Sequence, residues 1–218
     1  VNNTINYNGP GTENIKAPSA GYYNLIVGGS NIKSAVSDFT VLGDLTITST
    51  LSAATYTIDL EGSWTNLGSF TPGSSTLNID GATDQLLTSP SGGEFYRLTV
   101  NKALGVLTIA NDMLVDNTFT MTQGNVVTNS NILTLGSSSV LGENGTLSYV
   151  AGTIVGNFKR WVTTGITSYV FPVGTSVVHR PVLITLNDAP SGCLIIAFDE
   201  ATSPGGNGLI PLDDGGVD

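Results

Sequence analysis

The sequence predicts an all-β protein whose main part is a parallel β-solenoid, or β-helix. Three observations support this prediction: the composition favours strands over helices, apolar and polar residues alternate with a period of two, and the alternating segments recur in a fixed order. A distinct β module that resembles the start of a β-sandwich is expected to follow the solenoid.

The composition is typical of a folded β protein. Hydrophobic residues make up 40% of the chain, which is enough to bury a core, whereas charged residues make up only 11%, against about 25% in an ordinary soluble domain. No window combines abundant helix-forming residues with an apolar period of 3.6. The frequent Thr, Val and Ile suit strands, and the 27 glycines suit tight corners.

Short strands are predicted wherever apolar side chains alternate with Thr, Ser, Asn or Asp. In chain order the clearest segments are residues 45–48, 77–80, 107–109, 119–121 and 133–135. A period of two gives each strand one dry and one wet face. Turn residues separate the strands, as in Asn8-Gly9-Pro10, Asp80-Gly81 and Gly124-Asn125.

Internal similarity divides residues 1–150 into two predicted repeats of about 72 residues. The matching blocks are 4–9 with 76–81, 23–27 with 96–100, and 41–48 with 113–120. A solenoid and an antiparallel sandwich or barrel both satisfy this pattern. The solenoid is favoured because outward Thr and Asn residues stack into hydrogen-bonding ladders on successive coils. A secreted β-sandwich, with the repeat as a duplication, is the alternative.

Residues 151–218 form the predicted second module, which is expected to be truncated. Its features are the basic pair Lys159-Arg160, strand candidates at 181–186 and 193–198, and an acidic tail over 188–218. The chain begins at Val1 without an initiator methionine or a signal peptide, and we expect it to be a piece of a longer precursor.

Charge and residue usage exclude several classes of partner. The net charge of −10 repels nucleic acid and anionic lipid headgroups. No run of about 18 apolar residues is present, so membrane insertion is not expected. With Cys193 as the single cysteine, the chain cannot form an internal disulfide, and the fold must depend on packing and hydrogen bonds.

Several segments resemble the gliding-adhesin-like cell-surface repeat proteins that Bacteroidota secrete through the type IX secretion system. They read GSWTNLGSFTPGSST at 62–76, FYRLTV at 95–100, GNFKR at 156–160, YVFPVGT at 169–175 and RPV at 180–182. The resemblance implies an extracellular, non-enzymatic protein that is held at the cell surface or released, with a role in adhesion or gliding motility. The C-terminal sorting module of such proteins is not seen in this sequence.

A catalytic dyad would have to use the single histidine, His179, and the single cysteine, Cys193. Cys193 opens an apolar run that ends at Phe198, so a buried structural thiol is the preferred interpretation. No catalytic residue is therefore assigned, and the chain is not expected to be an enzyme.

Carboxylates provide the other possible chemistry, because solenoid lyases and hydrolases place them in a groove. Asp44 and Asp116 occupy equivalent repeat positions, as do Asp80 and Asn8. Recurrence at the repeat period favours a structural role in turns, since Asp and Asn side chains bond nearby backbone amides.

Calcium binding and a sugar-binding platform are two further hypotheses. The segment 205–210 begins like a calcium-binding repeat but has Ile210 where a ligand Asp is needed. A solvated loop is preferred at Asp213, Asp214 and Asp218, so no metal site or cofactor is assigned. Core packing is preferred for the aromatic residues Trp64, Trp161, Tyr22, Tyr23, Phe95 and Tyr96. The acceptor patterns at 2–4 and 144–146 carry no glycosylation assignment.

The expected function is that of a structural or adhesive segment of a large secreted surface protein, acting as a spacer or a ligand-presenting stalk. Its expected partners are cell-surface or secretion-machinery proteins, with extracellular glycans as a further class. The binding residues are unknown. The first alternative is a carbohydrate-binding module or a solenoid carbohydrate-active enzyme, and the second is a self-assembling filament subunit.

Overall fold

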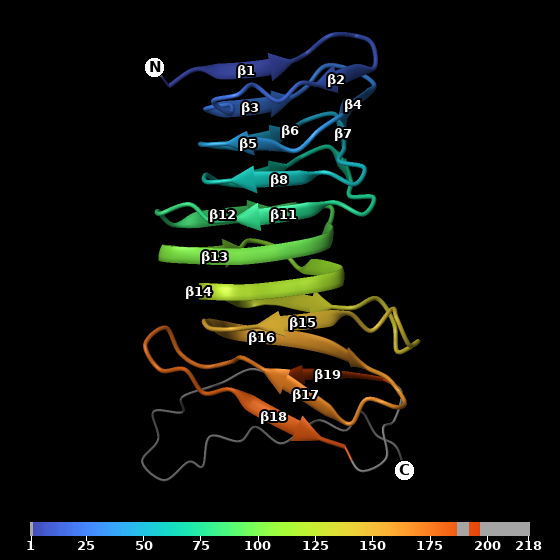
Figure 1. The fold of residues 1–218 in the computed structure, drawn as a ribbon, viewed down its shortest axis with the longest axis vertical. Helices are drawn as coiled ribbons and strands as arrows, with labels where there is room; N and C mark the ends of the chain where they lie inside the picture. Colours follow the sequence, from blue (N-terminus) through green and yellow to red (C-terminus); the bar gives the residue numbers. More distant parts are fainter. Residues whose placement is uncertain (1, 187–191, 197–218) are drawn as a thin grey trace.

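The computed structural model describes residues 2–186 and 192–196, and these residues form strands, turns and no helix. The chain winds into coils that stack along one long axis, from the first coil at the top of Figure 1 to the last strands near the bottom. Most neighbouring strands pair in parallel. The prediction of an all-β parallel solenoid is therefore confirmed, and the sandwich alternative for the main part is wrong.

Each coil crosses three faces of the solenoid in the order face 1, face 2, face 3. Face 1 carries β1 (Thr4–Tyr7), β3 (Asn24–Val27), β6 (Leu45–Ile47), β9 (Trp64–Asn66) and β12 (Gln85–Thr88). Face 2 carries β2 (Glu13–Ile15), β4 (Ile32–Ala35), β7 (Thr50–Ser52) and β10 (Ser69–Thr71). Face 3 carries β5 (Phe39–Val41), β8 (Thr57–Leu60), β11 (Thr76–Ile79) and β15 (Thr146–Tyr149).

Two long strands continue the ladders around the corners. In β13 (Gly93–Ile109) and β14 (Met113–Leu135), successive parts belong to faces 2, 3 and 1, with register shifts at the corners between them. The parallel ladder of face 1 then reaches β16 (Thr153–Val162), where Val126 pairs with Ile154. The segments predicted at 107–109, 119–121 and 133–135 all lie within these two strands.

The core is one column of inward side chains from all three faces. On face 1 the register aligns Leu25, Leu45 and Trp64, which are fully buried or nearly so. Thr46 and Thr65 lie between these positions and are half-buried on the outer surface. The period-two alternation of the sequence therefore separates core from surface, as expected for strands with one dry face.

The repeating unit of the structure is a coil of about 20 residues. Along face 1, register partners are 20 residues apart at Thr4 and Asn24, 19 at Leu45 and Trp64, and 28 at Val126 and Ile154. The blocks that match at a spacing of 72 lie on different faces, because residues 4–7 belong to face 1 and residues 76–79 to face 3. A spacing of 72 residues is therefore not a whole number of coils.

Antiparallel pairing begins in the last part of the described chain. Residues Phe158–Val162 of β16 pair antiparallel with β19 (Gly192–Ile196), and β17 (Ser168–Phe171) pairs antiparallel with β18 (Val182–Thr185). β18 corresponds to the strand predicted at 181–186. The change of pairing lies several residues beyond the predicted boundary at 150, because β16 still belongs to the parallel ladder. The sandwich-like module is a minor part of the described structure.

Candidate functional site

The histidine and the cysteine lie in different local environments. The two ring nitrogens of His179 contact the hydroxyls of Tyr149 (2.7 Å) and Thr153 (3.0 Å), and the ring stacks on Tyr149. Cys193 is exposed on β19 opposite Trp161. The expectation of a buried thiol is therefore wrong: the outward phase of the strand at this position exposes Cys193. The contacts of His179 hold a loop of the last module against the solenoid.

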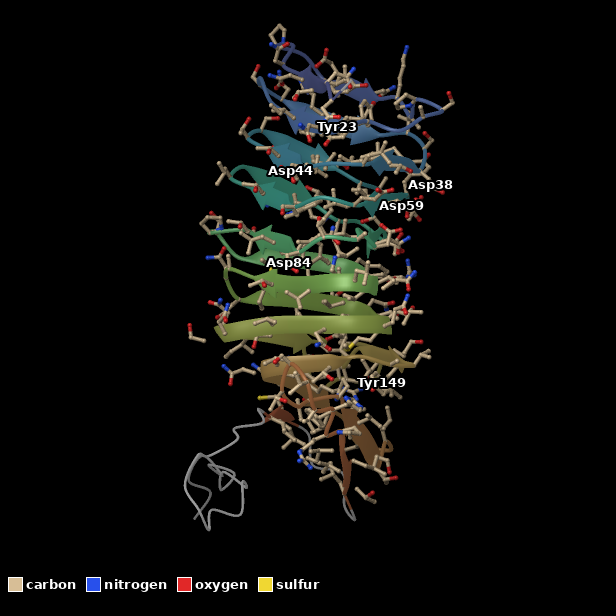
Figure 2. All side chains as sticks on the ribbon, turned by 90° about the vertical axis from the view of Figure 1, so that its left-hand side faces the viewer. Tyr23, Asp38, Asp44, Asp59, Asp84 and Tyr149 are labelled. Carbon is tan, nitrogen blue, oxygen red and sulfur yellow. The ribbon has the colours of Figure 1, made fainter. Side chains whose placement is uncertain are left out.

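Carboxylate and amide side chains at the corners bond to the backbone of the next coil. The N–H of Asp44 donates to Asn24 Oδ1 (2.9 Å), and the N–H of Ser63 donates to Asp44 Oδ1 (2.8 Å). In the same way, Thr57 donates to Asp38, Val106 to Asp84 and Ile132 to Asp112. Figure 2 shows Asp44 above Asp84 along one side of the rod, and Asp38 above Asp59 elsewhere. These bonds connect neighbouring coils, so they have a structural role.

The two pairs of repeat-equivalent residues have different surroundings. Asp44 lies before a strand of face 1, whereas Asp116 precedes the part of β14 that belongs to face 3. Asp80 follows β11 and is exposed, as is Asn8 after β1. Partial desolvation, with the negative charges of Asp59 and Glu61, raises the pKa of Asp80. Only Asp44 therefore has a defined inter-coil bond among these four residues.

Two buried lysines form clamps that the sequence prediction missed. Lys33 Nζ, fully buried, donates to the carbonyls of Gly9, Gly11 and Ser30 at 2.7–2.9 Å and lies 3.1 Å from Glu13 Oε2. Its bonds to residues 9 and 11 cross from the second coil to the first. A buried ammonium is stable only with such a set of acceptors.

Lys102 forms the equivalent clamp near the middle of the rod. Its Nζ donates to the carbonyls of Gly81 (2.6 Å) and Thr83 (2.7 Å) and to Gln85 Oε1 (2.7 Å). Desolvation lowers its pKa, and the charges of Asp84 and Asp80 partly offset this shift. The signal in the sequence is phase, because Lys102 follows the inward residues Leu98 and Val100 at intervals of two. Lys33 precedes inward Ala35 in the same way.

Three of the six candidate aromatic residues belong to the core. Trp64 is buried and contacts Phe70 and Phe95 edge-on, with ring centroids 4.8 and 5.5 Å apart. Tyr22 is also buried, and its hydroxyl lies 2.9 Å from that of Tyr7 and donates to the carbonyl of Lys16. The preference for core packing is thus confirmed for Trp64, Phe95 and Tyr22. These rings cannot form a surface platform.

The other three candidates, Tyr23, Tyr96 and Trp161, are half-buried at separate places. Arg97 lies over the ring of Tyr96 (4.6 Å), and Lys159 lies over that of Trp161 (4.9 Å). Tyr23 precedes β3 on face 1, Tyr96 lies in β13 and Trp161 in β16. They are therefore not arranged as one aromatic row.

The basic pair at 159–160 divides between surface and interior. Arg160 is buried between the solenoid and the last module, where its Nη1 donates to the carbonyl of Val170 (2.8 Å) and its guanidinium lies over Tyr169 (5.1 Å). Burial lowers the pKa of Arg160 to about 10, with Tyr169 acting in the opposite direction. Arg160 therefore joins the two parts of the chain.

Face 3 presents the most regular polar surface of the solenoid. One outward column, in register across six strands, contains Thr40, Asp59, Asn78, Thr99, Thr120 and Ser148. A second contains Thr57, Thr76, Arg97, Thr118 and Thr146. Side chains in each column repeat at the strand spacing of about 4.8 Å. Within the first column Asn78 donates to Asp59 (2.7 Å), so this array is the candidate binding surface.

A surface hollow lies beside the upper part of face 3. It is lined by residues 17–21 together with Asp38, Phe39, Thr40 and Asp59. Asp38 accepts the N–H of Thr57, and Asp59 accepts from Asn78, so one oxygen of each carboxylate has a structural partner. The hollow is thus an extension of the polar face 3.

Several sequence hypotheses fall outside what the structure describes. The calcium hypothesis at Asp213, Asp214 and Asp218 and the acidic tail over 188–218 lie mostly or wholly outside the described residues, as do positions 197–198 of the strand predicted at 193–198. Within residues 2–186 and 192–196, no three His, Cys, Asp or Glu side chains are placed to hold a metal ion. No helix in that part of the chain is long and apolar enough to cross a membrane.

Comparisons with known proteins give no match for the chain. No family model matches it, and neither a curated protein nor a solved structure does. The contacts of the corners, the buried lysines and face 3 are therefore the basis on which its function is inferred.

Proposed function

We propose that the chain is a non-enzymatic structural segment of a large secreted cell-surface protein, in which the solenoid acts as a spacer. The observation that carries this proposal is the continuous parallel ladder from β1 to β16. Each coil adds about 4.8 Å of length along the axis. A stack of this kind sets a distance between its two ends, which is what a spacer requires.

The chemistry of the buried polar groups supports the structural role. Lys33 and Lys102 use their ammonium groups to hold backbone carbonyls of other coils, and the corner residue Asp44 accepts a backbone N–H from the next coil. Their functional atoms are therefore engaged in holding the stack together. The low share of charged residues, 11%, fits a surface made mainly of hydroxyl and amide groups.

The location and partners are proposed from the sequence resemblance. A protein similar to the type IX secretion substrates of Bacteroidota would be extracellular and at the cell surface, with adhesion or gliding motility as its context. Its partners would be surface or secretion-machinery proteins. The solenoid would then carry an adhesive part away from the membrane.

A carbohydrate-binding module is the second candidate function, and face 3 favours it. The two outward columns place hydroxyl, amide and carboxylate groups in register over six strands. Sugar hydroxyls both donate and accept hydrogen bonds, and such an array can satisfy them. The spacer interpretation instead leaves face 3 hydrated.

A glycan array separates these two functions. The chain is labelled and applied to bacterial, plant and animal glycans, together with Thr120→Lys on face 3 and Thr46→Lys at an outward position of face 1. Both threonines are half-buried and lie within paired strands. The spacer proposal predicts no specific signal for any of the three proteins. Binding that Thr120→Lys abolishes and Thr46→Lys retains would contradict it and assign face 3 to a glycan.

A further inference from the structure

The first coil has an open end that continues the core. β1 is the terminal strand of its sheet and pairs only with β3. Ile5 lies in register with Leu25, which in turn pairs with Leu45. Both leucines are fully buried, whereas Ile5 is 41% exposed. An apolar side chain in the core column is thus left partly uncovered at the end of the rod.

The backbone at this end has hydrogen-bonding groups available for another strand. The carbonyls of Asn3 and Tyr7 accept from Asn24 and Gly28 on the next coil. Because the bonding direction alternates along a strand, the N–H and C=O of Thr4 and Asn6 point to the free edge. An edge with open donors and acceptors is a template for strand pairing.

Electrostatics favour contact between copies at this end over contact elsewhere. The first coil, residues 2–23, contains one acidic residue, Glu13, and one basic residue, Lys16, so its formal charge is −1 + 1 = 0. The whole chain carries −10, all of which therefore lies beyond the first coil. Two copies repel least when their first coils face each other.

The described part of the other end does not offer a matching open edge. The outer side of β16 is covered by β19, through antiparallel pairs from Phe158 to Val162. Its earlier part is met by a parallel bridge between Ile154 and Val173. Head-to-tail stacking, which would generate a filament, lacks an open parallel strand among these residues.

We propose that two copies of the chain dock head to head through their first coils. A two-fold axis between the copies makes the two β1 strands run antiparallel, so that each supplies the edge the other lacks. The Ile5 side chains then meet and close the core column. The product is a closed dimer of double length, with both last modules pointing outward, which goes beyond a role as a single spacer.

The test is the mass of the chain in solution, measured by sedimentation equilibrium over a wide concentration range. The wild-type chain is expected to show twice the monomer mass at high concentration. Ile5→Lys places a charge on the edge and is expected to weaken the dimer at least tenfold. Ile32→Lys is the matched control, because Ile32 is similarly exposed at 46% but lies on β4, which is paired on both sides. It is expected to dimerise like the wild type.

A second variant tests the pairing independently of the apolar contact. Asn6→Pro removes a backbone donor from the free edge and leaves the bonds of Asn3 and Tyr7 to the next coil in place. It is also expected to be monomeric, with circular dichroism showing a retained β spectrum. A wild-type chain that stays monomeric, a mass that grows beyond the dimer, or equal effects of the changes at 5 and 32 would each overturn the proposal.

Discussion

At the scale of single residues, the stability of the solenoid depends on buried cations that hold backbone carbonyls. Lys102 donates to Gly81, Thr83 and Gln85 from a buried position. The ammonium connects a corner to the coil that precedes it. The three acceptors have no equivalent partner if the ammonium is removed, because water has little access to them.

Replacing Lys102 with Met keeps the aliphatic volume and removes the ammonium. We expect the free energy of unfolding to fall by about 3 kcal/mol, since unpaired buried acceptors cost about 1–3 kcal/mol each and part of this cost is relieved by rearrangement. Urea denaturation measures the change. Lys16→Met is the control, because the Lys16 side chain is exposed, and a loss of equal size there would contradict the clamp.

Asp80 gives the chain a small, predictable pH dependence. Desolvation and the charges of Asp59 and Glu61 raise its pKa above the ordinary value of 3.8. Between that value and the raised one, the folded state binds more protons than the unfolded state, so stability falls as the pH rises through this window. At neutral pH the charged Asp80 therefore costs stability.

Asp80→Asn is expected to raise the Tm at pH 7 by no more than about 2 °C, because Asp80 is exposed and the repulsion is screened. Below about pH 3.8 the difference should vanish, since the carboxyl is then neutral in both states. Thermal melts at pH 3 and pH 7 check this. Asp44→Asn, which keeps an acceptor for Ser63 N–H, serves as the control. A gain from Asp80→Asn that persists at pH 3 would refute the explanation.

At the scale of elements, the sequence predicted strands better than corners. Alternation located the strands at 45–48 and 77–80, because inward and outward side chains differ in polarity along a pleated strand. It could not show that 107–109 and 119–121 belong to two long strands that bend around corners. The bend depends on backbone conformation at Gly105 and Gly124, which have positive φ angles.

The corner glycines differ in whether a side chain would fit. Gly152 has φ +108°, and a Cβ there would overlap the carbonyl oxygen of Gly124 on the neighbouring coil. Gly92 also has a positive φ, +93°, but has open space around it. The two positions therefore separate the cost of close approach from that of backbone conformation.

Gly92→Ala is expected to lower the free energy of unfolding by about 1 kcal/mol through backbone strain alone. Gly152→Ala is expected to cost about 3 kcal/mol or more, because the coils must also move apart. Chemical denaturation of both variants gives the comparison. Equal losses would show that the coils do not approach closely at Gly152.

At the scale of the whole molecule, the sequence predicted the solenoid but not the length of its repeat. Blocks such as 4–7 and 76–79 look alike because strands on faces 1 and 3 share the same inward alternation. Their spacing of 72 residues therefore reports similar strands and not similar coils. The candidate surface on face 3 was also hidden, because its columns combine residues from six strands that only the register aligns.

The lysine clamps show the same limit at the level of contacts. The phase of Lys33 and Lys102 in the alternation indicates that both point inward. Their acceptors, such as Gly9 and Gly81, lie more than 20 residues earlier in the chain. No local pattern identifies partners at that distance.

The most direct test of the stacked-coil spacer is to hold the chain by its ends in an optical trap and raise the force. Because each coil contacts mainly its neighbours, the rod should keep its folded length at low force and then extend in successive steps. Each step should release one coil of about 20 residues, or about 70 Å of extended chain. Extension of the whole chain in a single step, or smooth extension at low force, would contradict a rod built from stacked coils.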